Sequence, residues 1–275
     1  MKLLSSPNTD NHTNSRFSVI GKLLTALSVM LISQQLYAFN PNACLNTFQG
    51  EALKICQAAI KGDPKARYQL ARIYGDAMNS RSVDYQQSFH WHRELSRQAL
   101  RQELQDPIYS LAMYNTGVMY ADGVGVKRNA KNALFWFDKA ANRGEPLAMT
   151  RLAMLYEQGA PGISADSNKA RNWVQKAVDK DNPQAKVIMS KWILEGKINK
   201  NPTQAIELLK SASAQNSPQG AFALANMYAT GYEQLVKQDL IKAKQFYSIA
   251  CSQYVFEACK RYHDIDTTGR LEGVK

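Results

Sequence analysis

An interval of 36 residues between aromatic side chains restricts the fold of this chain more than any other feature of its sequence. Tyr120, Tyr156, Trp192 and Tyr228 follow one another at this constant spacing. Fixed periods of about 20 to 50 residues are typical of repeat arrays. One unit of this size cannot bury its apolar face alone, so neighbouring units must complete the core. We therefore expect a stack of similar units in which the repeated aromatics belong to the core.

The residues before each aromatic predict a helix. Leu and Ala stand four and three positions before three of the aromatics, at 70 and 71, 152 and 153, and 224 and 225, which places them on one helix face. Prolines that suit a first helical turn, most of them preceded by a good capping residue, open these helices at Pro64, Pro107, Pro146, Pro183 and Pro218. A glycine three or four residues after the aromatic predicts the helix end, because glycine tolerates positive φ.

A second helix follows in each unit. Its apolar positions are spaced by three and four residues, as in Ala133, Trp136, Phe137, Ala140 and Ala141. The pattern returns at 170–178 and 243–250. The interval from Tyr74 to Tyr120 is 46 residues, and most of the excess lies between Trp91 and Ala112. We therefore predict that the second helix of the first unit is longer than its counterparts.

The segment from Tyr120 to Val126, together with Ala133, Trp136, Lys139 to Ala141 and Gly144, resembles the Sel-one-like repeat family, which is related to the tetratricopeptide repeat. The resemblance covers about residues 51 to 264 and implies an all-α fold, a right-handed α/α solenoid (superhelix). Together with the patterns above it predicts a half repeat at 39–63, five repeats at 64–252, a capping helix at 253–266 and a flexible tail at 267–275.

Residues 1–38 look like a secretory signal. Arg16 and Lys22 precede an apolar run from Leu23 to Ile32, and Ala38 ends a suitable cleavage site. The run is shorter than the span of about 20 residues that crosses a bilayer. We expect cleavage near Ala38 and no stable membrane span afterwards, with an uncleaved anchor as the alternative. Signal and family together favour a periplasmic or secreted bacterial protein.

The four cysteines, Cys44, Cys56, Cys251 and Cys259, follow the expected signal, and an even number in an exported chain favours two disulfides. On one helix, residues eight apart are separated by about 12 Å. Bridged α-carbons lie within about 7 Å, so the last two cysteines can bond only if the chain turns between them, and two free buried thiols are the alternative. Resemblance to the family's cysteine-rich exported subgroup implies a 251–259 pair. Cys44 and Cys56 can likewise pair only if the chain turns between them, and Gln49 and Gly50 are the expected bend.

The sequence lacks the motifs of common catalytic sites. It contains no GxSxG, no HExxH, no GxxxxGK[ST], and no SxxK with KTG. His90 and His92 are two apart on an expected helix, so they point in different directions and cannot share a metal. We expect both to be partly exposed beside a buried Trp91. The sequence thus predicts no catalytic residue, no cofactor and no metal site.

The chain carries a formal net charge of +11. Lys and Arg are interleaved with Asp and Glu in every unit, without the concentrated basic stripe of a nucleic-acid-binding protein. We therefore expect no nucleic-acid partner. A diffuse positive charge suits an anionic component of the cell envelope, or simply a solvated surface.

Residues six and two positions before each aromatic lie on a second helix stripe. In the related tetratricopeptide fold this stripe lines the concave groove, so the resemblance implies contact with a protein or peptide. Aromatic side chains beside polar ones are common in such interfaces. The alternative is a surface without a ligand. The candidate residues are Tyr68, Arg72, Tyr114, Val118, Thr150, Met154, Lys186, Ser190, Phe222 and Asn226.

These observations predict a non-catalytic interaction scaffold or adaptor of the bacterial cell envelope, which binds its partner through the concave face. Two alternatives remain. Some cysteine-rich relatives suggest β-lactam binding or hydrolysis, although the serine motif is missing here. A secreted effector that engages a host protein is the other.

Overall fold

The structure is a computed structural model that describes residues 39–76 and 83–268. The expected signal at 1–38 and the end of the expected tail, 269–275, lie outside the described residues. The chain divides into two compact units, one ending at Lys54 and one beginning at Ile55. The described part of the first contains α2 (Ala43–Thr47) and the beginning of α3 (Gly50–Ile60).

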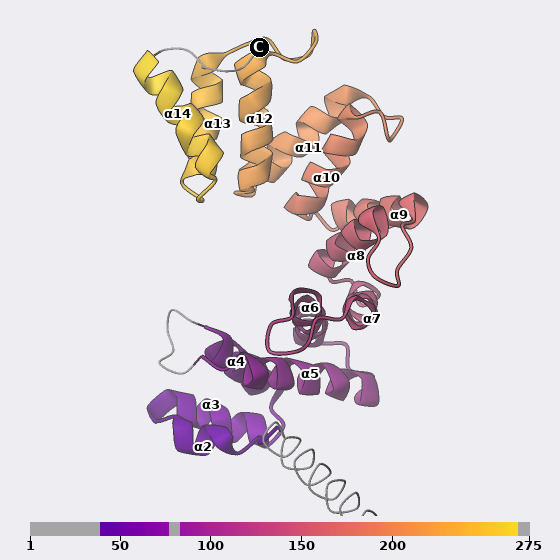
Figure 1. The fold of residues 1–275 in the computed structure, drawn as a ribbon, viewed down its shortest axis with the longest axis vertical. Coiled ribbons are helices and arrows are strands. Elements are labelled where there is room, and N and C mark those ends of the chain that lie inside the picture. The colour runs from indigo at the N-terminus through magenta and orange to yellow at the C-terminus, as the bar shows by residue number, and fades with distance from the viewer. Residues whose placement is uncertain (1–38, 77–82, 269–275) are drawn as a thin grey trace, which may run out of the picture. The chain divides into compact units, whose positions relative to one another are not determined.

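The second unit is a succession of helices in which each packs against the next, as Figure 1 shows. The first helices of the repeats are α4 (Pro64–Gly75), α6 (Pro107–Asp122), α8 (Pro146–Gln158), α10 (Pro183–Leu194) and α12 (Pro218–Thr230). The second helices are α5 (Tyr85–Gln102), α7 (Ala130–Ala141), α9 (Ser167–Asp179), α11 (Pro202–Ala214) and α13 (Leu240–Cys251), and α14 (Phe256–Thr268) follows. The expected all-α solenoid is confirmed. Two isolated bridges, Ala160–Ile163 and Tyr232–Val236, are the β-pairings among the described residues.

Side-chain caps fix the beginnings of the first helices. Asp63, for example, accepts a hydrogen bond from the Ala66 N–H, and Pro64 occupies the first turn. The capping residues before the other four predicted prolines act in the same way: Asp106, Glu145, Asn182 and Ser217. Glycine ends α6 at Gly123, where φ is 77°. The predicted start and stop signals are therefore confirmed.

Small and branched residues on the facing stripes form the core. Leu70, Leu152 and Leu224 are fully buried, and so are the alanines that follow them. Trp192 is also buried, whereas Tyr120, Tyr156 and Tyr228 are half-buried and pack against the core clusters. The repeated aromatics thus belong to the core, as expected, but three of them lie at its partly exposed margin.

The first repeat has the long second helix that the spacing predicts. α5 contains 18 residues, whereas α7 contains 12. Its C-terminal half places Leu95 and Ala99 in a core cluster shared with α6. The additional turns therefore extend the apolar interface.

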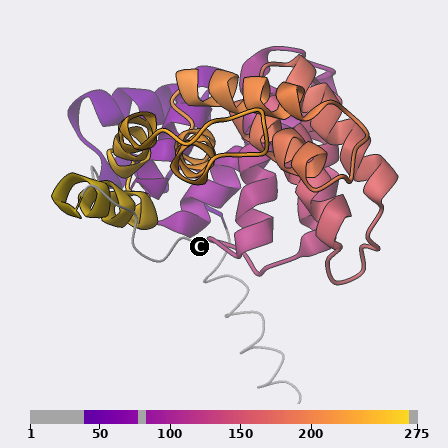
Figure 2. The same ribbon diagram turned by 90° about the horizontal axis from the view of Figure 1, so that it is seen from above.

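A disulfide joins Cys251 at the end of α13 to Cys259 in α14, with the α-carbons 4.6 Å apart. This confirms the expected turn and pairing. Figure 2 shows α12 to α14, coloured orange to yellow, as neighbours. Helix α14 begins three residues later than the expected cap and ends two residues later. Cys44 and Cys56 are also disulfide-bonded, and their mutual pairing stays a prediction.

Candidate partner-binding surface

Three of the candidate groove residues are buried, so the expectation that they face an open groove is wrong. Thr150 on α8, and Lys186 and Ser190 on α10, are each at most 4% exposed. The Lys186 ammonium donates to Asp181 and, over 2.7 Å, to the Ser211 hydroxyl on α11. Helical periodicity shows which face of α10 carries Lys186. It does not show that this face is buried, because the groups that contact Lys186 come from other segments.

The last repeat uses its two candidate residues within the fold. Asn226 Oδ1 accepts hydrogen bonds from the Tyr247 hydroxyl at 2.7 Å and from Arg261 Nη1 at 2.8 Å. The Arg261 guanidinium also lies 5.6 Å from the centre of the Phe222 ring. Arg261 belongs to α14, so this helix contacts the candidate residues of α12 in the last repeat.

Two of the four candidates of the first two repeats, Arg72 and Val118, line a pocket. Arg72 is exposed, whereas Tyr68 and Tyr114 are half-buried. Asn115 Nδ2 donates to the Tyr68 hydroxyl at 3.3 Å, which joins α6 to α4. The Tyr114 ring packs against Phe137 with ring centres 5.9 Å apart.

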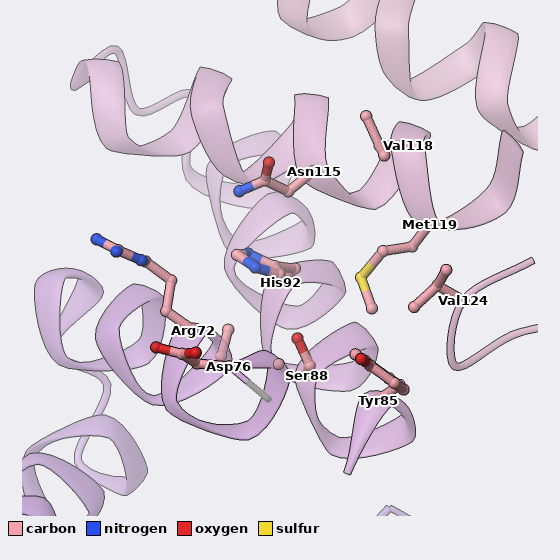
Figure 3. A pocket seen from close by; sticks show the side chains of 11 residues that line it. Arg72, Asp76, Tyr85, Ser88, His92, Asn115, Val118, Met119 and Val124 are labelled. Carbon is pink, nitrogen blue, oxygen red and sulfur yellow. The ribbon is translucent and has the colours of Figure 1, made fainter. Parts of the chain in front are cut away.

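We call this cavity the α4–α6 pocket, and its volume is about 430 Å³. Figure 3 shows that polar and apolar side chains from three helices surround it. The lining residues are Ala71, Arg72, Gly75 and Asp76 from α4 and the residue after it, Tyr85, Ser88 and His92 from α5, and Asn115, Val118, Met119 and Val124 from α6 and the following loop. Among the sequence candidates, Arg72 and Val118 line it directly.

His92 occupies the middle of the pocket view in Figure 3. The residue is only 5% exposed, which corrects the expectation that both histidines beside Trp91 are partly exposed. Its Nδ1 atom is buried and has no hydrogen-bond partner in the described part of the chain. The Tyr68 ring contacts it edge-on, with centres 5.4 Å apart. His90 is half-buried, as expected.

Burial lowers the pKa of His92 to about 4, and the positive charge of Arg72 contributes further. The ring is therefore neutral near pH 7, with one nitrogen as donor and the other as acceptor. The α4–α6 pocket thus combines a neutral imidazole, a guanidinium and a carboxylate beside an apolar wall. This combination suits the binding of a polar group.

One sequence signal could have identified His92 as buried. Ser88, His92 and Ser96 are spaced by four residues and share one face of α5. All three are buried, and Ser96 Oγ lies 3.1 Å from Thr116 Oγ1 on α6. In α5, polar residues spaced by four positions therefore form a buried polar stripe.

Among the residues that the structure describes, no three His, Cys, Asp or Glu side chains are grouped so that they could hold a metal ion. The same residues include no helix with both the length and the apolar character that a membrane span requires.

Comparison with protein families gives matches to the Sel1 repeat at residues 64–100, 110–145, 146–182, 183–217 and 218–255, which together make up most of the chain. Protein SHC1 of Saccharomyces cerevisiae is 26% identical over 215 residues, which cover 75% of this chain and 41% of that protein. Chitin synthase regulatory factor 3 of Schizosaccharomyces pombe is 28% identical over 142 residues, covering 51% of this chain and 14% of that protein. The chain thus spans less than half the length of these relatives.

Two solved structures share the fold. A Sel1 repeat protein from Oxalobacter formigenes is 22% identical, with a TM-score of 0.66 over 84% of this chain and 91% of that one. Immunity protein Pa5087 from Pseudomonas aeruginosa is 19% identical, with a TM-score of 0.52 over 72% of this chain and 68% of that one.

Proposed function

Because the chain belongs to the Sel1 repeat family, we propose that it is a non-catalytic scaffold of the bacterial cell envelope that binds a partner peptide at the α4–α6 pocket. Sel1 repeat proteins generally act as protein-interaction scaffolds. The observation that carries the choice of surface is the difference between repeats. Thr150 on α8 and both candidates on α10, Lys186 and Ser190, are buried. Asn226 on α12 accepts a hydrogen bond from Arg261 of α14. Arg72, by contrast, stays exposed beside a pocket.

Two features support the envelope as the location. The sequence of residues 1–38 has the pattern of a secretory signal. All four cysteines are in disulfides, which persist in oxidising compartments such as the bacterial periplasm. Fractionation of cells that express the full chain tests this part of the proposal. Recovery in the periplasmic fraction is expected, recovery in the culture supernatant would favour a secreted effector, and recovery only in the cytoplasm would contradict export.

Affinity capture tests the binding surface. Tagged protein beginning at residue 39 is incubated with an envelope extract of its source cells, as the unsubstituted chain and as Arg72→Glu and Lys65→Glu. Both substitutions reverse an exposed charge on α4, but Lys65 does not line the pocket. We expect Arg72→Glu to reduce recovery of the partner at least tenfold and Lys65→Glu to leave it unchanged. Equal recovery with both variants would exclude the pocket as the binding surface.

The absence of catalysis is tested against the enzymatic alternative. Purified protein should hydrolyse a chromogenic β-lactam no faster than a heat-inactivated sample does. Turnover that exceeds this control would replace the scaffold by an enzyme.

A further inference from the structure

A second cavity is formed by α9, α10 and α11, of which α10 packs against both of the others (Figure 1). We call it the α9–α11 pocket, and its volume is about 400 Å³. Met189 and Ile193 of α10 contribute buried side chains to its lining, and Val178 of α9 and Leu208 of α11 contribute half-buried ones. Of the described residues, none lines both this pocket and the α4–α6 pocket, so the two are separate sites.

One aromatic position of the first helices is aliphatic at this pocket. The tenth residue after the opening proline is a tyrosine in three of the other four repeats, and α6, which is longer, carries Tyr120 three residues later. In the repeat that Pro183 opens, the tenth residue is Ile193. The three tyrosines are Tyr74, Tyr156 and Tyr228.

One aromatic position of the second helices is aliphatic at the same pocket. The seventh residue after the N-cap is aromatic in the other four repeats, whereas in α11 it is Leu208, seven residues after Asn201. Both exceptions therefore fall in one repeat and line one cavity. The four aromatic residues are Trp91, Trp136, Trp173 and Phe246.

The remaining aromatic of this repeat does not fill the space. Trp192 keeps the interval of 36 residues, but it does not line the α9–α11 pocket, and its indole Nε1 donates to Glu157 at 2.7 Å. In the last repeat, by contrast, the rings of Tyr228 and Phe246 stack with centres 5.7 Å apart and planes 3° apart. The fourth repeat thus has a cavity beside two aliphatic residues at the positions where the last repeat has two stacked rings.

The lining favours an aromatic ring over an alkyl chain. The thioether of Met189 makes favourable contacts with aromatic rings. Lys200 lines the pocket as well, and an ammonium group is attracted to the face of a ring, most strongly to that of tryptophan. The chain contains such a pair in α9, where the Lys176 ammonium lies 4.3 Å from the centre of the Trp173 ring.

The charges at the pocket favour an acidic neighbour beside that ring. Glu207 lines the pocket but is paired with Lys210 at 2.9 Å. Lys200 donates to the Gln175 amide oxygen at 3.2 Å and has no carboxylate partner in the part of the chain that the structure describes. A partner with a carboxylate at this place would complement the charge of Lys200.

We propose that the α9–α11 pocket receives the indole side chain of a tryptophan of a partner protein, next to an acidic residue of that partner. The indole lies against Ile193, Leu208 and Met189, and the neighbouring carboxylate pairs with Lys200. An aromatic side chain buries about 150 to 250 Å², and buried tryptophans are common anchors of protein interfaces. The pocket is therefore an interaction site in addition to the α4–α6 pocket.

Methyl NMR tests the proposal with small probes. The protein, with its disulfides intact, is labelled at the methyl groups of isoleucine and methionine and titrated with the acetylated dipeptide amide of aspartate and tryptophan. We expect saturable shifts of Met189 and Ile193 and none of Ile265, which is on α14 and outside the lining. Three further probes are an aspartyl-leucine dipeptide, a lysyl-tryptophan dipeptide and free indole. Each should bind at least about threefold more weakly, because each lacks one of the proposed contacts.

Each probe also has an outcome that contradicts the proposal. No shift with the aspartyl-tryptophan probe would overturn it. Equal binding of the leucine probe would show a general apolar site, and equal binding of indole would assign the pocket to a free aromatic molecule. Equal binding of the lysyl-tryptophan probe would overturn the acidic neighbour.

A pair of matched variants locates the binding site. Leu208→Trp restores the ring that other repeats have at this position, so it should abolish the saturable shift of Met189 without lowering the midpoint of thermal unfolding. Leu147→Trp makes the same change at an exposed position of α8 outside the lining, and probe binding should stay unchanged. Persistent binding to Leu208→Trp would exclude the α9–α11 pocket. If this variant does not fold, the titrations of the unsubstituted protein decide.

A charge reversal tests the neighbouring contact independently. Lys200→Glu should bind the lysyl-tryptophan probe more tightly than the aspartyl-tryptophan probe, which inverts the preference of the unsubstituted protein. An unchanged preference would contradict the pairing with Lys200. None of these measurements involves Arg72, so their failure is distinguishable from failure of the proposed function, which partner capture by Arg72→Glu tests.

Discussion

Burial of His92 couples the stability of the fold to pH. Its folded pKa of about 4 lies below the ordinary value of 6.5. Between these values the unfolded chain binds a proton that the folded chain does not, so the free energy of unfolding rises with pH. The contribution is fully present above pH 6.5, is lost as the pH falls to about 4, and amounts to about 3 kcal/mol.

Urea unfolding near pH 7 and near pH 4.5 measures this effect. The loss of stability at the lower pH should be clearly smaller in His92→Gln than in the unsubstituted chain. His90→Gln should change it less, because His90 is only half-buried and burial lowers its pKa less strongly. A pH dependence that is the same in all three proteins would mean that His92 is not buried in solution.

Two glycines that both have positive φ should respond differently to alanine. Gly125 has φ +68°, and a Cβ there would lie 1.9 Å from the Tyr85 carbonyl oxygen. Gly144 has φ +87°, and its Cβ would meet nothing within 4 Å. Gly144→Ala should therefore cost only the left-handed conformation, about 1 to 2 kcal/mol. Gly125→Ala should cost at least about 3 kcal/mol, because overpacking is added. Thermal or urea unfolding gives both values, and equal losses would contradict the close approach.

For single residues, the sequence predicted membership of the core more reliably than it predicted exposure to solvent. The stripe of Leu152 and Ala153 is buried as its spacing requires. The groove candidates Thr150 and Lys186 are buried as well, although the same reasoning placed them on the surface. Periodicity assigns residues to faces of their own helix, whereas the burial of Lys186 depends on Asp181 and Ser211, which lie elsewhere in the chain.

The link between α13 and α14 should contribute measurably to stability. The disulfide closes a loop of eight residues. Replacing both Cys251 and Cys259 by alanine should lower the free energy of unfolding by about 2 to 3 kcal/mol, because the unfolded chain regains its freedom. Urea unfolding without reductant measures the loss. Non-reducing mass spectrometry of the unsubstituted chain should show 251 linked to 259 and 44 linked to 56, and a crossed pairing would contradict both assignments.

Arg261 should be the main polar attachment of α14. It donates to Asn226 and Tyr247 and pairs with Glu257, with distances of 2.8, 3.3 and 2.9 Å. Arg261→Met keeps an aliphatic side chain but leaves the Asn226 oxygen with fewer donors, and it should destabilise the protein by about 1 to 3 kcal/mol. The neighbouring Lys260 is exposed, so Lys260→Met should change stability by less than about 0.5 kcal/mol. Similar unfolding midpoints for the two variants would contradict the role of Arg261.

The beginnings and ends of the elements were largely predictable, because short-range chemistry fixes them. A cap followed by proline, as in Asn182 and Pro183, is sufficient to locate a helix start. The α4–α6 pocket was only partly predictable. The choice of residues two positions before each repeated aromatic identified Arg72 and Val118. The pocket also requires the end of α4, one face of α5 and the loop after α6. No local pattern specifies how three segments meet.

On the scale of the whole molecule, the effect of a core mutation should stay local. Leu152 is fully buried on α8, and α8 packs against α7 and α9. Leu152→Ala should destabilise the array by about 2 to 5 kcal/mol. In a repeat array each unit contacts only its neighbours. Hydrogen exchange should therefore accelerate in α7 to α9 and stay unchanged in α13 and α14. Uniform acceleration along the chain would indicate a single cooperative unit instead.

The buried ammonium of Lys186 has a consequence for how such a chain can evolve. Arrays of like units lengthen and shorten readily when recombination duplicates or deletes one copy. Here the positive charge depends on a carboxylate from the preceding turn and a hydroxyl from the following helix. Ser211 belongs to the same repeat as Lys186, whereas Asp181 ends the repeat before it. A deletion or rearrangement that gave this copy a different predecessor would replace Asp181 and leave the charge without its carboxylate partner in the interior. The order of the units around α10 is thus chemically constrained, even though their backbones look interchangeable.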